Sequence, residues 1–173
     1  MTKPKFERAK ILALLAQHNI DLAKEQVVLI GMRAGKNKIG VFDDSFCWIT
    51  PDLCEGFNGN CDPSTEQQGR ANLKAGLWRY QMGMHNGTHL PPYEAFRQAA
   101  PVTVMRWDEK KGTASIPDTG MFGINIHHGG SGTSSLGCQT VPMEQWPEFK
   151  NLGYKLLQKA AKKDFAYLLV DSL

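Results

Sequence analysis

The chain has 173 residues, of which 42% are hydrophobic, and its 20 basic and 17 acidic side chains leave a net charge of +3. This composition is typical of an ordinary globular protein and predicts one domain, residues 1–173, that is large enough to bury a core. It contains no run of eighteen apolar residues, so a membrane-spanning helix is excluded and we expect no membrane insertion.

The N-terminal segment predicts a helix over residues 5–18. Phe6, Ala9, Leu12 and Leu15 form an apolar stripe at helical spacing, with charged residues opposite. The segment lacks the small-residue cleavage site of a signal peptide, so we expect the protein to be cytoplasmic as synthesised.

Residues 27–70 predict short strands followed by a long loop. Runs of β-branched and aromatic residues indicate strands over 27–32, 39–42 and 45–50, with turns between them, as in an antiparallel sheet. Residues 51–70 are rich in turn formers and lack periodicity. Because a loop this long is often functional, we interpret it as one wall of a cleft.

The remaining segments predict further strands and two helices. Their order is a strand within 73–85, a helix over 93–99, a strand over 102–107 with a hairpin partner at 113–116, a turn over 117–120, a helix over about 143–163 and a strand over 165–170. Pro147 and Gly153 are potential interruptions of the second helix. The predicted fold is therefore mostly β (α+β), with helices at both ends of the chain.

Four cysteines occur, at positions 47, 54, 61 and 138, and none forms a Cys-x-x-Cys pair. The spacing of seven between the first three fits no zinc finger, and free thiols are the simplest interpretation. A Cys54–Cys61 disulfide stays open for a protein that works outside the cell. The mild basic charge lacks a strip interleaved with aromatics, so we expect no nucleic-acid partner.

Residues 121–142, MFGINIHHGGSGTSSLGCQTVP, carry the strongest functional signal. An apolar strand over 121–126 delivers His127 and His128 to a loop of small polar residues, which returns to Gly137 and Cys138. A nearby imidazole can take the proton of a thiol, and glycines let backbone N–H groups gather into an oxyanion pocket. The pattern favours a cysteine nucleophile with a histidine base; a glycine-rich loop with an ordinary buried cysteine is the alternative.

The same stretch resembles the catalytic motif of the L,D-transpeptidase (YkuD-type) family. That family has a strand ending in Ile-His-Gly, a polar loop and then Ser-His-Gly-Cys, and the order of Ile126, His127, Ser135, Gly137 and Cys138 matches it. The form of the motif is most similar to compact members found in phage lysis proteins. Three features depart from the pattern: a shorter loop, Leu136 in place of histidine, and Thr140 in place of arginine.

The resemblance implies a β-sandwich or barrel fold and a role for each motif residue. Cys138 is the nucleophile and His127 the base, oriented through its other ring nitrogen by the backbone carbonyl of His128. The N–H groups of Gly137 and Cys138 are the expected oxyanion donors. His128 is the rival base, because neighbours on a strand point to opposite faces. The expected substrate-binding residues are Arg79, Tyr80, His85, Gly130, Ser131, Ser134 and Ser135.

The implied substrates are peptidoglycan stem peptides, cleaved without a cofactor. We favour hydrolysis by an endolysin-like peptidase or a recycling L,D-carboxypeptidase, because no export signal or wall-binding repeat occurs. Such an enzyme acts on the wall after release, or on recycled muropeptides. The alternatives are an L,D-transpeptidase that forms crosslinks or exchanges D-amino acids, and a non-catalytic cell-wall binding module.

Metal chemistry is the third interpretation of the motif. A zinc hydrolase would use His127, His128 and Cys138. His85 and His89 also have the i, i+4 spacing of a zinc pair, but the Asn-Gly pair between them predicts a turn rather than a helix. We therefore expect no metal site, and the sequence leaves the oligomeric state open.

Overall fold

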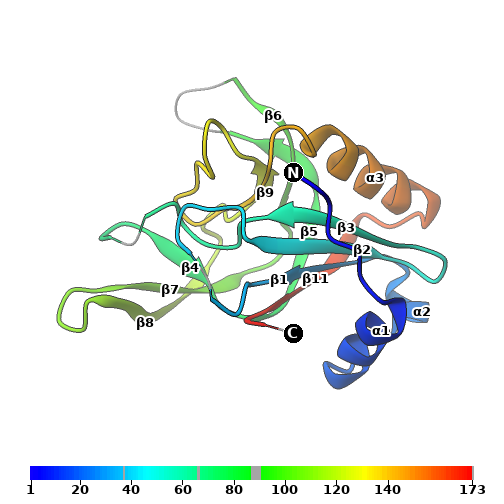
Figure 1. The fold of residues 1–173 in the computed structure, drawn as a ribbon, viewed down its shortest axis with the longest axis horizontal. Helices are drawn as coiled ribbons and strands as arrows, with labels where there is room; N and C mark the ends of the chain where they lie inside the picture. Colours follow the sequence, from blue (N-terminus) through cyan, green and yellow to red (C-terminus); the bar gives the residue numbers. More distant parts are fainter. Residues whose placement is uncertain (37, 66, 87–90, 173) are drawn as a thin grey trace.

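The computed structural model describes residues 1–36, 38–65, 67–86 and 91–172 (Figure 1). Its helices are α1 (Arg8–Gln17), α2 (Leu22–Glu25) and α3 (Trp146–Lys159). The strands of the larger sheet are, in spatial order, β10 (Gln139–Val141), β9 (Ile126–His128), β6 (Tyr93–Gln98), β5 (Gly76–His85), β11 (Asp164–Val170), β1 (Val28–Met32), β2 (Asp44–Ile49) and β3 (Cys54–Gly59). A smaller sheet contains β4 (Ala71–Leu73), β7 (Val102–Asp108) and β8 (Thr113–Gly120).

The eight-stranded sheet curls until its two edges meet. Asn60, just after β3, and Thr140, in β10, exchange two backbone hydrogen bonds of 2.8 Å each. Mutual pairing of this kind satisfies part of the edge backbone that an open sheet would leave exposed. β9 and β10 run parallel, with Thr140 opposite His127. The closing seam therefore brings together the two halves of the motif around His127 and Cys138.

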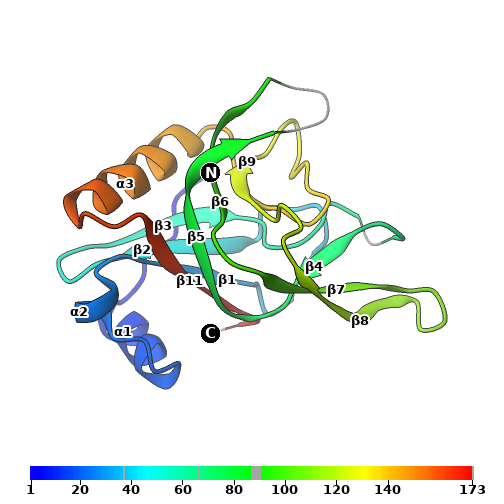
Figure 2. The ribbon, with the colours of Figure 1, turned by 180° about the vertical axis from the view of Figure 1, so that it is seen from behind.

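The strands at the centre of the sheet are buried on both faces. In β1 and β11 alternate residues point inward to an aromatic core or outward to α1, as the two-residue period of a strand requires. The outward set, which includes Ile30 and Leu168, packs on Ile11, Leu14 and Leu15 of α1. In Figures 1 and 2, α1 and α2 lie at one end of the molecule and the β7–β8 hairpin extends from the other.

Helix α3 covers the inner face of the sheet through aromatic contacts. The ring of Phe149 lies 5.2–5.6 Å from the rings of Phe46, Trp48 and Phe57, a spacing at which aromatic pairs attract one another. Gly153 continues the helix instead of interrupting it. A Cβ at this position would lie 2.5 Å from Trp48, so glycine permits the close approach of helix and sheet.

The structure confirms the predicted mostly β architecture with flanking helices. The N-terminal helix, the strands at 27–32, 45–50, 102–107 and 165–170, and the C-terminal helix all occur within a few residues of their expected bounds. No helix in the described ranges is long and apolar enough to span a membrane.

Several predicted elements are wrong, each for an identifiable reason. The helix expected over 93–99 is strand β6, which pairs with β5 and buries Ala95 and Phe96. The loop expected over 51–70 contains β3, while 39–42 holds no strand and 117–120 continues β8. Residues 121–125 form no strand, because the Gln98 side chain accepts hydrogen bonds from the N–H groups of Phe122 and Ile124 in place of a neighbouring strand.

The four cysteines are free thiols, as the spacing indicates. The open Cys54–Cys61 pairing does not match the geometry, because Cys54 Sγ lies 3.5 Å from Cys47 Sγ. Cys61 instead lies within the core, with its Sγ 3.9 Å from the Tyr167 hydroxyl. This difference follows from the β2–β3 hairpin, which places Cys54 opposite Ile49 and so diagonal to Cys47.

Candidate active site

The motif around Cys138 lines a cleft of about 790 Å³. The cleft lies where the closing seam of the larger sheet meets the smaller sheet. Ala71 links the smaller sheet to the loop that carries Cys138, since it pairs with Arg106 of β7 and its N–H donates to the Leu136 carbonyl. The lining residues are Gly69, Ala71, His85, Asn86, Tyr93, Arg106, Phe122, Gly123, Ile124, His127, His128, Gly130, Ser134, Leu136, Gly137 and Cys138.

A tight turn presents the thiol of Cys138 to the cleft. Gly137 has φ +148°, and a Cβ there would lie 2.5 Å from the Ala71 carbonyl oxygen, so the turn requires glycine. Ser135 closes the turn, because its Oγ accepts from the Gly137 N–H and donates to the Cys138 carbonyl. The Cys138 Sγ accepts from the Asn125 N–H at 3.4 Å and lies 3.5 Å from the Gly123 carbonyl.

His127 is held in one orientation by its own strand. Its Nδ1 donates to the His128 carbonyl oxygen at 2.6 Å, and the Tyr93 hydroxyl lies 3.2 Å from the same nitrogen. Because a carbonyl can only accept, Nδ1 carries the proton and Nε2 is the basic nitrogen of the neutral ring. One ring nitrogen of His127 and the Cys138 Sγ lie within 4.8 Å of each other. The His128 carbonyl is the orienting acceptor that the resemblance implied.

The cleft favours the neutral forms of both members of the Cys138–His127 pair. Burial, with a smaller effect of the neighbouring ring of His85, lowers the pKa of His127 to about 4. Burial raises the pKa of Cys138 to about 11, against a smaller opposite effect of the Asn125 N–H. The resting pair is therefore a thiol and a neutral imidazole, and the proton has to move during attack on a substrate.

The neutral resting state predicts how Cys138 reacts with iodoacetamide. The alkylation rate should rise about tenfold per pH unit from about pH 7 to about pH 10, because only the thiolate reacts. Cys47 should react more slowly than Cys138, since it lies in the core and burial raises its pKa. Peptide mapping of the alkylated protein at several pH values measures both rates. A plateau near pH 7 would instead indicate a preformed thiolate–imidazolium pair.

His85, an expected substrate-binding residue, lies beside the Cys138–His127 pair. Its ring stacks on the ring of His127 with centroids 4.3 Å apart, and its Nδ1 lies 3.0 Å from the Asn125 side-chain nitrogen. His85 therefore belongs to the innermost part of the cleft. His89, which the zinc spacing also involved, lies outside the described residues.

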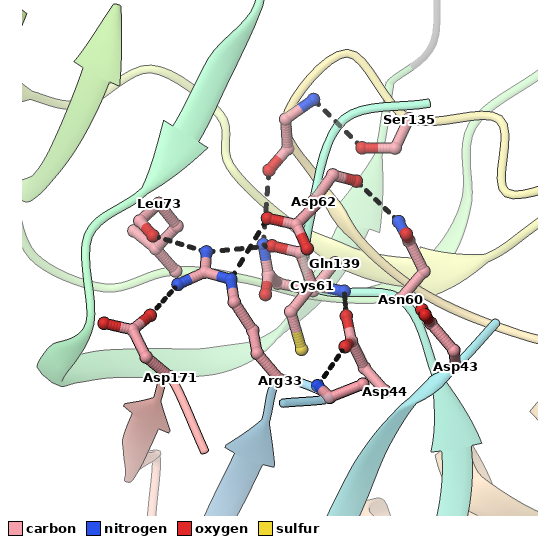
Figure 3. A network of polar contacts seen from close by, with 12 residues as sticks. Arg33, Asp43, Asp44, Asn60, Cys61, Asp62, Leu73, Ser135, Gln139 and Asp171 are labelled. Atoms are coloured by element: carbon pink, nitrogen blue, oxygen red, sulfur yellow. Dashed lines mark hydrogen bonds and ion pairs between the residues drawn. The ribbon is translucent and has the colours of Figure 1, made fainter. Parts of the chain in front are cut away.

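A buried polar network contacts the loop that carries Cys138, and Figure 3 shows the part of it around Arg33, Cys61 and Gln139. Gln139 Nε2 donates to the carbonyls of Gly137 and Cys61, while the Tyr167 hydroxyl donates to Gln139 Oε1. Arg33 donates to the same Cys61 carbonyl and pairs with Asp62 at 3.0 Å. The network connects the turn that carries Cys138 to the ends of β1 and β3.

Several predicted site residues lie outside the cleft. Arg79 pairs with Glu25 of α2 and with Asp164 of β11, and Tyr80 is fully buried against Phe165 and Tyr167. The resemblance implied that both residues bind substrate, but the alternation and direction of β5 point their side chains away from the cleft.

Of the predicted substrate-binding residues in the loop between His128 and Cys138, some line the cleft and others do not. Gly130 and Ser134 line the cleft as expected, whereas Ser135 is buried in the turn and Ser131 is exposed outside the lining set. The Gly137 N–H donates to Ser135 Oγ and is therefore not free for an oxyanion in this conformation. The Cys138 N–H makes no hydrogen bond to a described residue and remains the candidate donor.

Sequence reasoning missed Arg106, Tyr93 and Phe122. The guanidinium of Arg106 lies 4.7 Å from the centre of the Phe122 ring and its Nε donates to Asp118 at 3.1 Å. Tyr93 stacks on His128 with ring centroids 4.4 Å apart. Arg106 and Tyr93 reach the cleft through strand pairing, whereas Phe122 lies in the irregular segment that Gln98 holds in place. No local pattern in the sequence marks the three residues.

The fold and site together define a mostly β protein with a cysteine–histidine pair in an open cleft. Comparison with protein-family models, with curated proteins and with solved structures finds no match.

Proposed function

We propose that the protein is a cysteine peptidase that cleaves peptidoglycan stem peptides through a thioester intermediate. The observation that carries the proposal is the arrangement of Cys138 and His127: the thiol and a ring nitrogen lie within 4.8 Å in a cleft, with Nδ1 of His127 fixed on the His128 carbonyl. A nucleophile, a base and an orienting acceptor are the minimum set for such catalysis.

The arrangement supports the following sequence of steps. Nε2 of His127 takes the thiol proton as Sγ attacks the substrate carbonyl, and the Cys138 N–H stabilises the developing oxyanion. The tetrahedral adduct collapses when His127 returns the proton to the leaving amine, which leaves a thioester. His127 then removes a proton from water, which attacks the thioester and regenerates the thiol. His128 is the weaker candidate for the base, because it does not belong to the group that His85, His127 and Cys138 form, and its ring packs on Tyr93.

The choice of substrate rests on the resemblance and on one feature of the cleft. Thr140, which stands where the family has an arginine, is fully buried and cannot meet a substrate. Arg106 approaches the same cleft from β7 and offers a cation to a terminal carboxylate. A stem peptide with a free D-alanine carboxylate fits this arrangement.

Muropeptide digestion tests the proposal. Tetrapeptide monomers and crosslinked dimers are incubated with wild type and with Cys138→Ala, and the products are read by mass spectrometry. Loss of terminal D-alanine or cleavage of the dimer by wild type alone supports the peptidase. Exchange of D-alanine for an added D-amino acid supports the transpeptidase alternative. If neither protein yields a product, the peptidase proposal is overturned and a non-catalytic cell-wall binding module is favoured. The raised pKa of Cys138 and the presence of Leu136 are the observations that support this second candidate.

Arg106 provides a prediction about specificity. Arg106→Gln should lower kcat/KM by about 10- to 100-fold on a tetrapeptide with a free carboxylate, because a charge-assisted hydrogen bond contributes about 1.5–3 kcal/mol. The tetrapeptide amidated at its terminal D-alanine is the control, since it offers no terminal carboxylate and should be cleaved equally by wild type and variant. An equal loss on both substrates would mean that Arg106 only supports the cleft wall.

A further inference from the structure

Three potential metal ligands converge at the floor of the cleft. One ring nitrogen of His85, one of His127 and the Sγ of Cys138 all lie within 4.8 Å of one another. They come from the end of β5, from β9 and from the turn before β10, so only the folded chain brings them together. His128, which the sequence had offered as the second histidine of a zinc site, is not part of this group.

Hydrogen bonds to the ring nitrogens of His85 and His127 can orient both side chains as metal ligands. The His127 Nδ1 proton is bound by the His128 carbonyl, which leaves Nε2 as a lone-pair donor. Asn125 lies against Nδ1 of His85 and is only 6% exposed, yet its Oδ1 has no hydrogen-bond partner among the described residues. Rotation of this amide by half a turn would let Oδ1 accept the Nδ1 proton of His85 and free Nε2 for a metal.

The protonation states agree with this geometry. Burial lowers the pKa of both histidines, so neither ring is charged at neutral pH. A neutral imidazole can bind a cation directly, whereas the thiol has to lose its proton. Ligands at about 2.0–2.3 Å from a tetrahedral zinc ion are separated from one another by about 3.3–3.8 Å. The three ligand atoms now lie within 4.8 Å of one another, so each pair would have to approach by at most about 1.5 Å.

We infer that His85, His127 and Cys138 form a binding site for Zn²⁺ and that the bound ion blocks Cys138 as a nucleophile. Two imidazoles and one thiolate are a common zinc ligand set, and the cleft leaves the fourth position to water. The binding part of this inference is independent of the peptidase; the inhibitory part rests on the proposed function. The inhibition would be reversible, because removal of the ion by a chelator would leave the Cys138 thiol and the His127 ring free to react.

Calorimetric titration with ZnCl₂ tests the binding. Wild type should bind one Zn²⁺ per chain and release about one proton, seen as a dependence of the heat on the buffer. Cys138→Ala and His85→Gln should each weaken the affinity by about 10- to 100-fold or more. His18→Gln is the matched control, because His18 is exposed at the end of α1 and should leave binding unchanged. Absence of stoichiometric binding by wild type, or equal binding by all four proteins, would overturn the site.

Two measurements on the wild type keep the test independent of how the variants fold. Zn²⁺ should protect Cys138, but not Cys54, from iodoacetamide, and Co²⁺ should give a thiolate-to-metal charge-transfer band.

Muropeptide cleavage, measured with chelator and again with excess zinc, then separates the metal site from the proposed peptidase. Cleavage that zinc suppresses supports both, and cleavage without zinc binding overturns the metal site alone. Zinc binding without any cleavage leaves the site standing and overturns the peptidase, together with the inhibitory role of the metal.

Discussion

Replacement of His127 by alanine is expected to lower kcat/KM for stem-peptide cleavage by about 10²- to 10⁴-fold, the usual contribution of a positioned general base. The large effect follows from the resting state of the pair. Because the pKa of Cys138 is about 11, very little thiolate exists at neutral pH and attack depends on a base that removes the proton. Initial rates with a purified tetrapeptide, measured for wild type and variant at one pH, provide the test.

Two matched variants make this result specific. His128→Ala should lose less than about tenfold, since its ring packs on Tyr93 and lines the cleft but does not belong to the group around Cys138. His18→Ala removes an exposed histidine at the end of α1, which does not line the cleft, and should behave as wild type. If His128→Ala proves the more damaging of the two cleft variants, the roles of the neighbouring histidines are the reverse of those proposed.

The pH profile of the same reaction follows from the low pKa of His127. The ring has to be neutral to accept the proton, and it is neutral at every pH above about 4. Activity should therefore persist through weakly acidic pH and fall only as the pH drops through about 4, where His127 becomes protonated. An acid limb near pH 6.5 would mean that substrate binding restores the ordinary pKa of the ring.

The sequence was sufficient for elements whose pattern is local. β1 and β11 are continuous apolar runs, and α1 has an apolar stripe that meets one face of the sheet. The helix predicted over 93–99 is wrong because Glu94, Ala95 and Arg97 are good helix formers, whereas pairing with β5 and burial of Phe96 decide the structure. Local propensity is the weaker influence wherever a segment completes a sheet.

The same distinction explains which parts of the site could be predicted. His127 and Cys138 stand eleven residues apart on one loop, so their sequence neighbourhood revealed them. Arg106 and Tyr93 reach the cleft only because β7 pairs with β4 and β6 pairs with β5. Arg79 was expected to bind substrate but lies outside the cleft for the same reason. The sequence of a strand does not show which of its faces or ends will meet the cleft.

Arg33→Met is expected to lower the free energy of unfolding by about 3–5 kcal/mol, the cost of removing one member of a buried ion pair. Arg33 is 10% exposed and its partner Asp62 is 3% exposed, and Arg33 also donates to the carbonyls of Cys61 and Leu73. The buried Asp44 carboxyl lies in the same network, and burial, with a smaller effect of Asp62, raises its pKa to about 6. Without the guanidinium, the repulsion between these two carboxylates loses its main compensation.

Urea denaturation of Arg33→Met and Arg79→Met compares a buried arginine with a half-exposed one. Arg79 also pairs with two carboxylates, but it is 35% exposed, so its loss should cost no more than about 1 kcal/mol. Adding Asp62→Asn to Arg33→Met then identifies the cause of the larger loss. Recovery in the double variant would assign the loss to the charge of Asp62 in the absence of Arg33. An unchanged loss would assign it to the hydrogen bonds at Cys61 and Leu73, and so to the contacts that support the turn carrying Cys138.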